Sequence, residues 1–227
     1  MTLSVICLKN ELVKGYTVMS NNKSKMNLPN KLTVLRIIMV PIFVIVMMLP
    51  ESVLSFELSG IIGIALFIVA SLTDMLDGKI ARKYNLVTDF GKLMDPLADK
   101  FMVIGALTVI VYRYANVRWL FIWALLIVVF RELAVTSIRL VASSSGGVVI
   151  AANMLGKIKT VVQIVCICSV VLEPLIYSIP TVGGALPAWW VANVPLTYLT
   201  CVLMIYFTIH SGINYIVGAW KYLDPQK

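Results

Sequence analysis

Charged residues are scarce in this sequence, and histidine is almost absent. Only 13% of the 227 residues are charged, 60% are hydrophobic, and there is a single histidine. With a mean hydropathy of +0.93, the chain has too little polar surface for a soluble domain. The composition therefore predicts one polytopic, all-α integral membrane protein.

Cysteine and histidine form no recognisable metal-binding pattern. The four cysteines, Cys7, Cys166, Cys168 and Cys201, lack ligand spacing, and the last three lie in apolar stretches. We expect them to be small core residues. The histidine, His210, has no cysteine or carboxylate at ligand spacing, so we expect a packed polar residue.

Apolar runs separated by polar turns predict six membrane-spanning helices. Several runs are too short to cross the roughly 30 Å of hydrocarbon unless their charged ends complete the span. The expected spans lie near residues 33–50, 58–82, 92–113, 118–142, 155–178 and 195–219.

Lysine and arginine are distributed unevenly over these spans. Of the 19 basic residues, only Arg113 and Arg118 fall in loops on one side, and the others fall on or near the opposite side. This pattern predicts that both termini and the more basic side face the cytoplasm. An anionic lipid leaflet is enough to explain the net charge of +8, so no nucleic-acid partner is expected.

Acidic residues are also few, but five of the six aspartates lie in one stretch between two apolar runs. Asp74 and Asp77 are three residues apart, and Gly91, Asp95 and Asp99 follow at steps of four, so each set shares a helix face. Two facing helices would bring four carboxylates together, which requires compensating cations. Oxygen ligands alone favour a hard cation such as Mg²⁺ or Mn²⁺.

Several residues of this stretch keep a fixed spacing: Asp74, Asp77, Gly78, Ala81, Arg82, Gly91, Asp95 and Asp99. Their pattern resembles the signature of the CDP-alcohol phosphotransferase family at every fixed position. The resemblance implies six transmembrane helices preceded by an N-terminal cytoplasmic juxtamembrane helix. It also implies a homodimer in the bacterial cytoplasmic membrane, with the active site on the cytoplasmic side.

The same resemblance implies roles for individual residues. Two divalent ions, Mg²⁺ or Mn²⁺, would be held by Asp74, Asp77, Asp95 and Asp99, and Asp99 would also be the catalytic base. The expected contacts to CDP-diacylglycerol are Asn30, Thr33, Gly78, Ala81, Arg82, Thr88 and Gly91.

A second polar group lies in the segment RELAVTSIRL and just after it. Arg131 and Arg139 are eight residues apart and share a helix face, and Lys157 lies at the expected start of the next helix. Such basic groups suit an anionic substrate that carries a phosphate. The segments RELAVTSIRL, LGKIKT and Ser211-Gly212-x2-Tyr215 resemble the branch of the family that makes phosphatidylglycerol phosphate. That branch implies transfer of the phosphatidyl group from CDP-diacylglycerol to glycerol 3-phosphate, bound by Arg131, Arg139 and Lys157.

Three other classes remain compatible with parts of the sequence. A sister phosphotransferase would keep the aspartates and use inositol phosphate, serine or phosphatidylglycerol as acceptor. A membrane prenyltransferase also binds a diphosphate through aspartates, but its usual motif occurs twice, and no second copy is found here. A divalent-cation transporter would use carboxylates in the membrane but would leave Gly78, Arg82 and the basic residues near Arg131 unexplained.

The first residues differ in composition from the rest of the chain. Residues 1–25 contain no sustained apolar run and end in serine, asparagine and lysine, so we expect a disordered extension. Residues 26–222 are predicted to form the membrane domain, and residues 223–227 a short tail.

Overall fold

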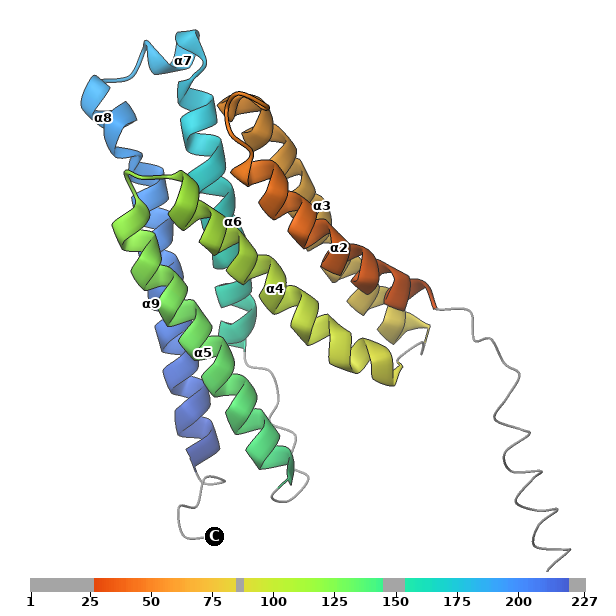
Figure 1. Ribbon diagram of the computed structural model, residues 1–227. Helices are drawn as coiled ribbons and strands as arrows, with labels where there is room; N and C mark the ends of the chain where they lie inside the picture. Colours follow the sequence, from red (N-terminus) through yellow and green to blue (C-terminus); the bar gives the residue numbers. More distant parts are fainter. Residues whose placement is uncertain (1–26, 85–87, 145–153, 221–227) are drawn as a thin grey trace, which may run out of the picture.

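The structure is a computed structural model that describes residues 27–84, 88–144 and 154–220, without the side chains of Ala81, Arg82, Lys92 and residues 142–144. Every regular element in this part of the chain is a helix, which confirms the all-α prediction. The long helices are α2 (Leu28–Met48), α3 (Phe56–Lys83), α4 (Asp89–Arg113), α5 (Arg118–Ser144), α6 (Met154–Tyr177) and α9 (Pro195–Ala219). Two short helices, α7 (Pro180–Gly183) and α8 (Ala188–Asn193), connect α6 to α9 (Figure 1).

Five segments of the described chain are long and apolar enough to cross a membrane, so this is a multi-pass membrane protein. They lie in α2, α3, α5, α6 and the stretch that ends with α9. The remaining predicted span, near residues 92–113, corresponds to α4. This helix has 25 residues, but its first half carries Asp89, Asp95 and Asp99, which make it more polar than the others. The predicted juxtamembrane helix does not occur as a separate element among the described residues, because α2 begins at Leu28 and continues without a break.

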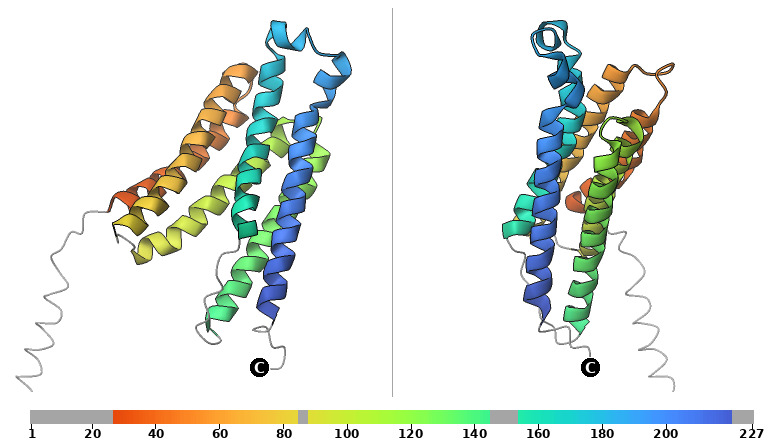
Figure 2. Two further views of the ribbon diagram at one scale, coloured as in Figure 1. Left: turned by 180° about the vertical axis from the view of Figure 1, so that it is seen from behind. Right: turned by 90° about the vertical axis from the view of Figure 1, so that its left-hand side faces the viewer.

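The helices form two groups that α3 and α4 join. In one group α2 packs against α3 and α4, and in the other α9 packs against α5 and α6. Helix α4 runs obliquely between them and contacts both α5 and α6 (Figures 1 and 2). Cys166 and Cys201 lie in the buried core, as expected from their apolar surroundings. Helix α3 also contacts α6, so two helices of the first group reach the second.

Successive long helices run in opposite directions (Figure 1). The starts of α2, α4 and α6 and the ends of α3, α5 and α9 lie at one end of the bundle, which we call the carboxylate end (Figure 1). At the opposite end, Arg113 of α4 donates hydrogen bonds to the carbonyl oxygens of Met47 (2.7 Å) and Phe56 (2.9 Å) and to Ser59 Oγ (2.6 Å). These bonds hold α2, α3 and α4 together away from the carboxylate end.

Glu173 of α6 caps the start of the neighbouring helix α9. Its carboxylate accepts the backbone N–H groups of Leu196 (3.1 Å) and Thr197 (2.7 Å) and the hydroxyl of Tyr177 (2.8 Å). Val194, the N-cap residue, has φ of 39° and provides no side-chain cap. Because the first N–H groups of a helix have no intrahelical acceptor, a carboxylate at this place both bonds them and complements the helix dipole.

We expect Glu173→Gln to lower the thermal unfolding midpoint of the purified protein in detergent. Glu173 is only 2% exposed, and hydrogen bonds to a charged group contribute about 1.5–3 kcal/mol each. The midpoint can be followed by the loss of helical circular dichroism. Glu57→Gln, which changes an exposed residue in the first turn of α3, is the matched control and should have little effect. Equal midpoints for the two variants would contradict the capping role.

Candidate active site

Helix α2 holds three of the four motif aspartates. Arg36, which is fully buried, forms ion pairs with Asp74 (Nη1 to Oδ1, 2.6 Å) and with Asp77. Thr33, one turn earlier on α2, donates a hydrogen bond to Asp95 Oδ1 (2.6 Å). One face of α2 therefore contacts carboxylates from both α3 and α4.

The charges of Asp74 and Asp77 explain why a buried arginine lies beside them. Asp74 and Asp77 are three residues apart on α3, so their carboxylates face the same way and repel each other unless a cation lies between them. The Arg36 guanidinium supplies that positive charge. The Asp77 side chain is 5% exposed and the Asp74 side chain 38%, so Asp74 is the more open of the two. This end of α3 is thus built to bind positive charge.

The donor chemistry of these carboxylates fits a hard divalent cation. Asp74, Asp77 and Asp95 offer only oxygen atoms, which Mg²⁺ and Mn²⁺ prefer. Within the described ranges, no three His, Cys, Asp or Glu side chains come close enough together to form a ready metal-binding group. Asp74 and Asp77 pair with Arg36 instead, and Asp95 pairs with Thr33.

The start of α4 packs closely against α2 beside these carboxylates. Thr88 is the N-cap of α4: its Oγ1 accepts the N–H of Gly91 (3.0 Å) and donates to Asn30 Oδ1 (2.9 Å). A Cβ atom on Gly91 would lie 3.2 Å from Asn30 Oδ1 and 3.3 Å from Thr88 Oγ1, so only glycine fits here without a shift. The structure thus brings four predicted nucleotide contacts, Asn30, Thr33, Thr88 and Gly91, to one place.

The other predicted nucleotide contacts lie on α3. Gly78 is half-buried and directly follows Asp77. Ala81 and Arg82 belong to the same helix, but their side chains are outside the described ones.

A cavity of about 440 Å³ lies between α4, α5, α6 and α9, and we call it the basic cavity. Asp99 lines it from α4, Arg131 and Arg139 from α5, and Lys157 from the first turn of α6. The sequence analysis assigned these four residues to the base and to the acceptor phosphate, and the structure brings them together. Asp99 is one helical turn after Asp95, so the basic cavity adjoins the carboxylates held by α2. His210 is exposed, does not line this cavity, and stacks on Tyr206 with ring centroids 5.8 Å apart.

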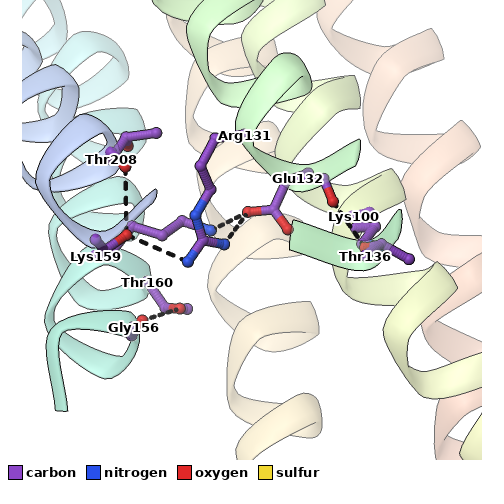
Figure 3. A network of polar contacts seen from close by, with 9 residues as sticks. Lys100, Arg131, Glu132, Thr136, Gly156, Lys159, Thr160 and Thr208 are labelled. Carbon is purple, nitrogen blue, oxygen red and sulfur yellow. Dashed lines mark hydrogen bonds and ion pairs between the residues drawn. The ribbon is translucent and has the colours of Figure 1, made fainter. Parts of the chain in front are cut away.

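Polar contacts hold the cationic side chains of the basic cavity. Arg131 donates to Glu132 Oε1 (2.9 Å) and to Ser211 Oγ of α9 (3.2 Å), and Lys159 of α6 forms an ion pair with Glu132 (Figure 3). A Cβ atom on Gly212 would lie 3.2 Å from Arg131 Cγ, so a glycine at this position leaves room for the arginine.

Arg139 is held in a similar way, farther toward the end of α5. Its Nε lies 3.4 Å from the hydroxyl of Tyr215, and its guanidinium lies 5.8 Å from the centre of the same ring. Helix α9 thus holds both arginines of α5 that line the basic cavity.

The sequence analysis gave no role to Arg36, Glu132 or Lys159. Arg36 could have been found from its spacing, because it follows Asn30 and Thr33 at steps of three on one helix face. Nothing in the spacing of Glu132 and Lys159 shows that they form a pair, since they are 27 residues apart on different helices.

Comparison with known proteins agrees with the geometry. The family model described as CDP-alcohol phosphatidyltransferase matches residues 26–220. A CDP-diacylglycerol–glycerol-3-phosphate 3-phosphatidyltransferase from Bacillus subtilis is 42% identical over 87% of this chain and 97% of its own length. A protein with the same description from Rickettsia typhi is 37% identical over 64% of this chain and 76% of its own. A probable phosphatidylglycerophosphate synthase from Mycobacterium tuberculosis is 34% identical over 86% of this chain and 82% of its own. The chain belongs to the CDP-alcohol phosphatidyltransferase family.

Proposed function

We propose that this chain transfers the phosphatidyl group of CDP-diacylglycerol to glycerol 3-phosphate, which gives phosphatidylglycerol phosphate and CMP. The observation that carries the proposal is the basic cavity, where Asp99 and three predicted phosphate-binding cations line one space beside the motif aspartates. The Bacillus subtilis relative, whose description states this reaction, is 42% identical over nearly its whole length.

The carboxylates near α2 would form the donor side of the site. Asp74, Asp77 and Asp95, completed by Asp99, would hold two Mg²⁺ or Mn²⁺ ions, whose charge offsets that of the diphosphate. Arg36 keeps Asp74 and Asp77 side by side on α3. The CDP group would lie against the residues gathered beside them: Asn30, Thr33, Gly78, Ala81, Arg82, Thr88 and Gly91.

The basic cavity would form the acceptor side. Arg131, Arg139 and Lys157 would bind the phosphate of glycerol 3-phosphate through charge-assisted hydrogen bonds. Asp99, on another wall of the same cavity, would remove the proton from the 1-hydroxyl of glycerol 3-phosphate. The oxygen of that hydroxyl would at the same time attack the β-phosphorus of the donor. The bond from that phosphorus to CMP then breaks, and the lipid product stays in the bilayer.

We further propose the features that the family resemblance implies for the whole protein. Helix α4 would also cross the membrane, which completes the six predicted spans. The carboxylate end would face the cytoplasm, because Arg113 and Arg118 lie toward the opposite end. Residues 26–222 would be the catalytic domain, with residues 1–25 as an extension. The homodimer and the number of metal ions rest on the resemblance alone.

The reaction can be tested by measuring CMP release from CDP-diacylglycerol with a panel of acceptors. We expect release with glycerol 3-phosphate and little or none with serine, which has no phosphate for the cations of the basic cavity to bind. We also expect little release with inositol phosphate or phosphatidylglycerol, because the descriptions of the Bacillus subtilis and Rickettsia typhi relatives name glycerol 3-phosphate. Faster release with any other acceptor would move the chain to a sister branch of the family.

Arg131→Ala should weaken acceptor binding and spare donor binding. Loss of a charge-assisted hydrogen bond is worth about 1.5–3 kcal/mol, so we expect the KM for glycerol 3-phosphate to rise roughly 10- to 150-fold. The KM for CDP-diacylglycerol should change much less. Arg118→Ala, at the exposed start of α5, is the control. A higher donor KM with an unchanged acceptor KM would assign Arg131 to the diphosphate instead.

Asp95→Asn should abolish turnover, because it removes one of the charges that offset the divalent ions. CMP release and the unfolding midpoint should both be measured against Mn²⁺ concentration. Wild-type protein is expected to gain stability as Mn²⁺ is added, and Asp95→Asn to gain much less. Asp89→Asn, in the first turn of the same helix but outside the motif, is the control. Normal turnover of Asp95→Asn, or turnover in excess chelator, would rule out the metal-binding role.

A further inference from the structure

Glu132 is the common partner of two cations in the basic cavity. Its Oε1 accepts a hydrogen bond from Arg131 on the same helix and forms an ion pair with Lys159 of α6 (Figure 3). The side chains are mostly buried, at 14% exposure for Arg131 and Glu132 and 7% for Lys159. One carboxylate therefore joins α5 to α6 inside the cavity.

The charge of Glu132 decides where these two cations lie. Lys159 brings an ammonium group into the interior of a membrane protein, where an unpaired charge is costly. Without the carboxylate, the ammonium of Lys159 and the guanidinium of Arg131 would be neighbouring like charges and would repel each other. The carboxylate of Glu132 contacts both cations, so it offsets their repulsion and holds the two side chains in place.

Enough donors remain for a ligand after these pairs have formed. A guanidinium has five N–H donors and an ammonium three. Nη1 of Arg131 donates to Glu132 and Nη2 donates to Ser211, so each of these nitrogens keeps one further N–H. Both cations can thus be held by Glu132 and still donate to an anion in the cavity.

The same turn of α5 also reaches α4. The backbone carbonyl of Glu132 accepts the hydroxyl of Thr136 (2.7 Å), which in turn accepts a hydrogen bond from Lys100. Lys100 directly follows Asp99, the proposed base. Glu132 therefore lies where the wall that carries the base meets the walls that carry the cations.

We propose that Glu132 is a positioning residue for recognition of the acceptor phosphate. Its carboxylate holds the Arg131 guanidinium and the Lys159 ammonium together in the lining of the basic cavity, where both can donate to one phosphate monoester. Glu132 acts through these cations and does not itself contact the acceptor. The inference rests on the proposed function, since it names the residue that prepares the acceptor side of that site.

The test compares Glu132→Gln with Glu132→Asp in detergent-purified full-length protein. For Glu132→Gln we expect the KM for glycerol 3-phosphate to rise about 10-fold or more, as for the loss of a charge-assisted contact. The KM for CDP-diacylglycerol and kcat should each change less than about threefold, because donor binding and chemistry are retained. Glu132→Asp keeps the charge and should recover part of the acceptor KM. Glu57→Gln is the matched control and should equal wild type.

A double variant separates positioning from a purely structural role. Glu132→Gln leaves Lys159 buried without its partner and is expected to lower the unfolding midpoint. Glu132→Gln/Lys159→Gln removes both charges, so the midpoint should recover while the acceptor KM stays high. A wild-type acceptor KM in Glu132→Gln, or a double variant that recovers the KM together with the midpoint, would overturn the proposal. If Glu132→Gln does not fold, the double variant and Glu132→Asp decide the outcome.

A measurement without the donor distinguishes failure of this inference from failure of the proposed function. Inorganic phosphate should raise the unfolding midpoint of the wild type and raise that of Glu132→Gln much less. A wild type that releases no CMP with glycerol 3-phosphate would overturn the proposed function, while a phosphate effect that depends on Glu132 would still support the inference. Absence of any phosphate effect on the wild type, or an equal effect on Glu132→Gln, would overturn the inference even if turnover is normal.

Discussion

The ion pairs of Arg36 with Asp74 and Asp77 are the interaction on which the carboxylate end depends. In an apolar bundle, two neighbouring carboxylates are stable only beside positive charge, and the fully buried guanidinium of α2 supplies it. The same face of α2 holds Asp95 of α4 through Thr33. The rotation of α2 about its axis therefore determines where these three carboxylates point.

Other buried charges in the protein also have partners, but of different kinds. Arg113 donates hydrogen bonds to two backbone carbonyls and a serine hydroxyl, and Glu173 accepts hydrogen bonds from backbone N–H groups at the start of α9. Glu132 forms ion pairs with two cations, Arg131 and Lys159. At the end opposite the carboxylates the charges are satisfied by neutral groups and fix the ends of helices. In the basic cavity, cations and carboxylates face one another around a space that can admit a ligand.

Helix periodicity explains how much of this could be predicted. Apolar runs and turns placed the long helices to within a few residues, and steps of three and four placed the aspartates on common faces. The positions of Arg131, Arg139 and Lys157 in one cavity followed from their place at the same ends of adjoining helices. Spacing along a single helix was enough for these inferences.

The remaining features depend on how one helix is rotated against another, which a single sequence does not contain. The pairing of Arg36 with α3 and of Glu132 with Lys159 joins residues far apart in the chain, and only packing brings them together. The three aspartates of α4 also make it less apolar than the other long helices, although it has a similar length. The close approach of α4 to α2 at Gly91 is likewise a contact between helices.

The oblique course of α4 has a consequence for how the two substrates affect each other. Asp95 and Asp99 lie one turn apart on this helix, the first bonded to α2 and the second lining the basic cavity. A helical turn is stiff, so a displacement of α4 moves both carboxylates together. Any ligand that shifts this helix changes the affinity for a ligand on its other side, and thermodynamic linkage makes that influence equal in both directions.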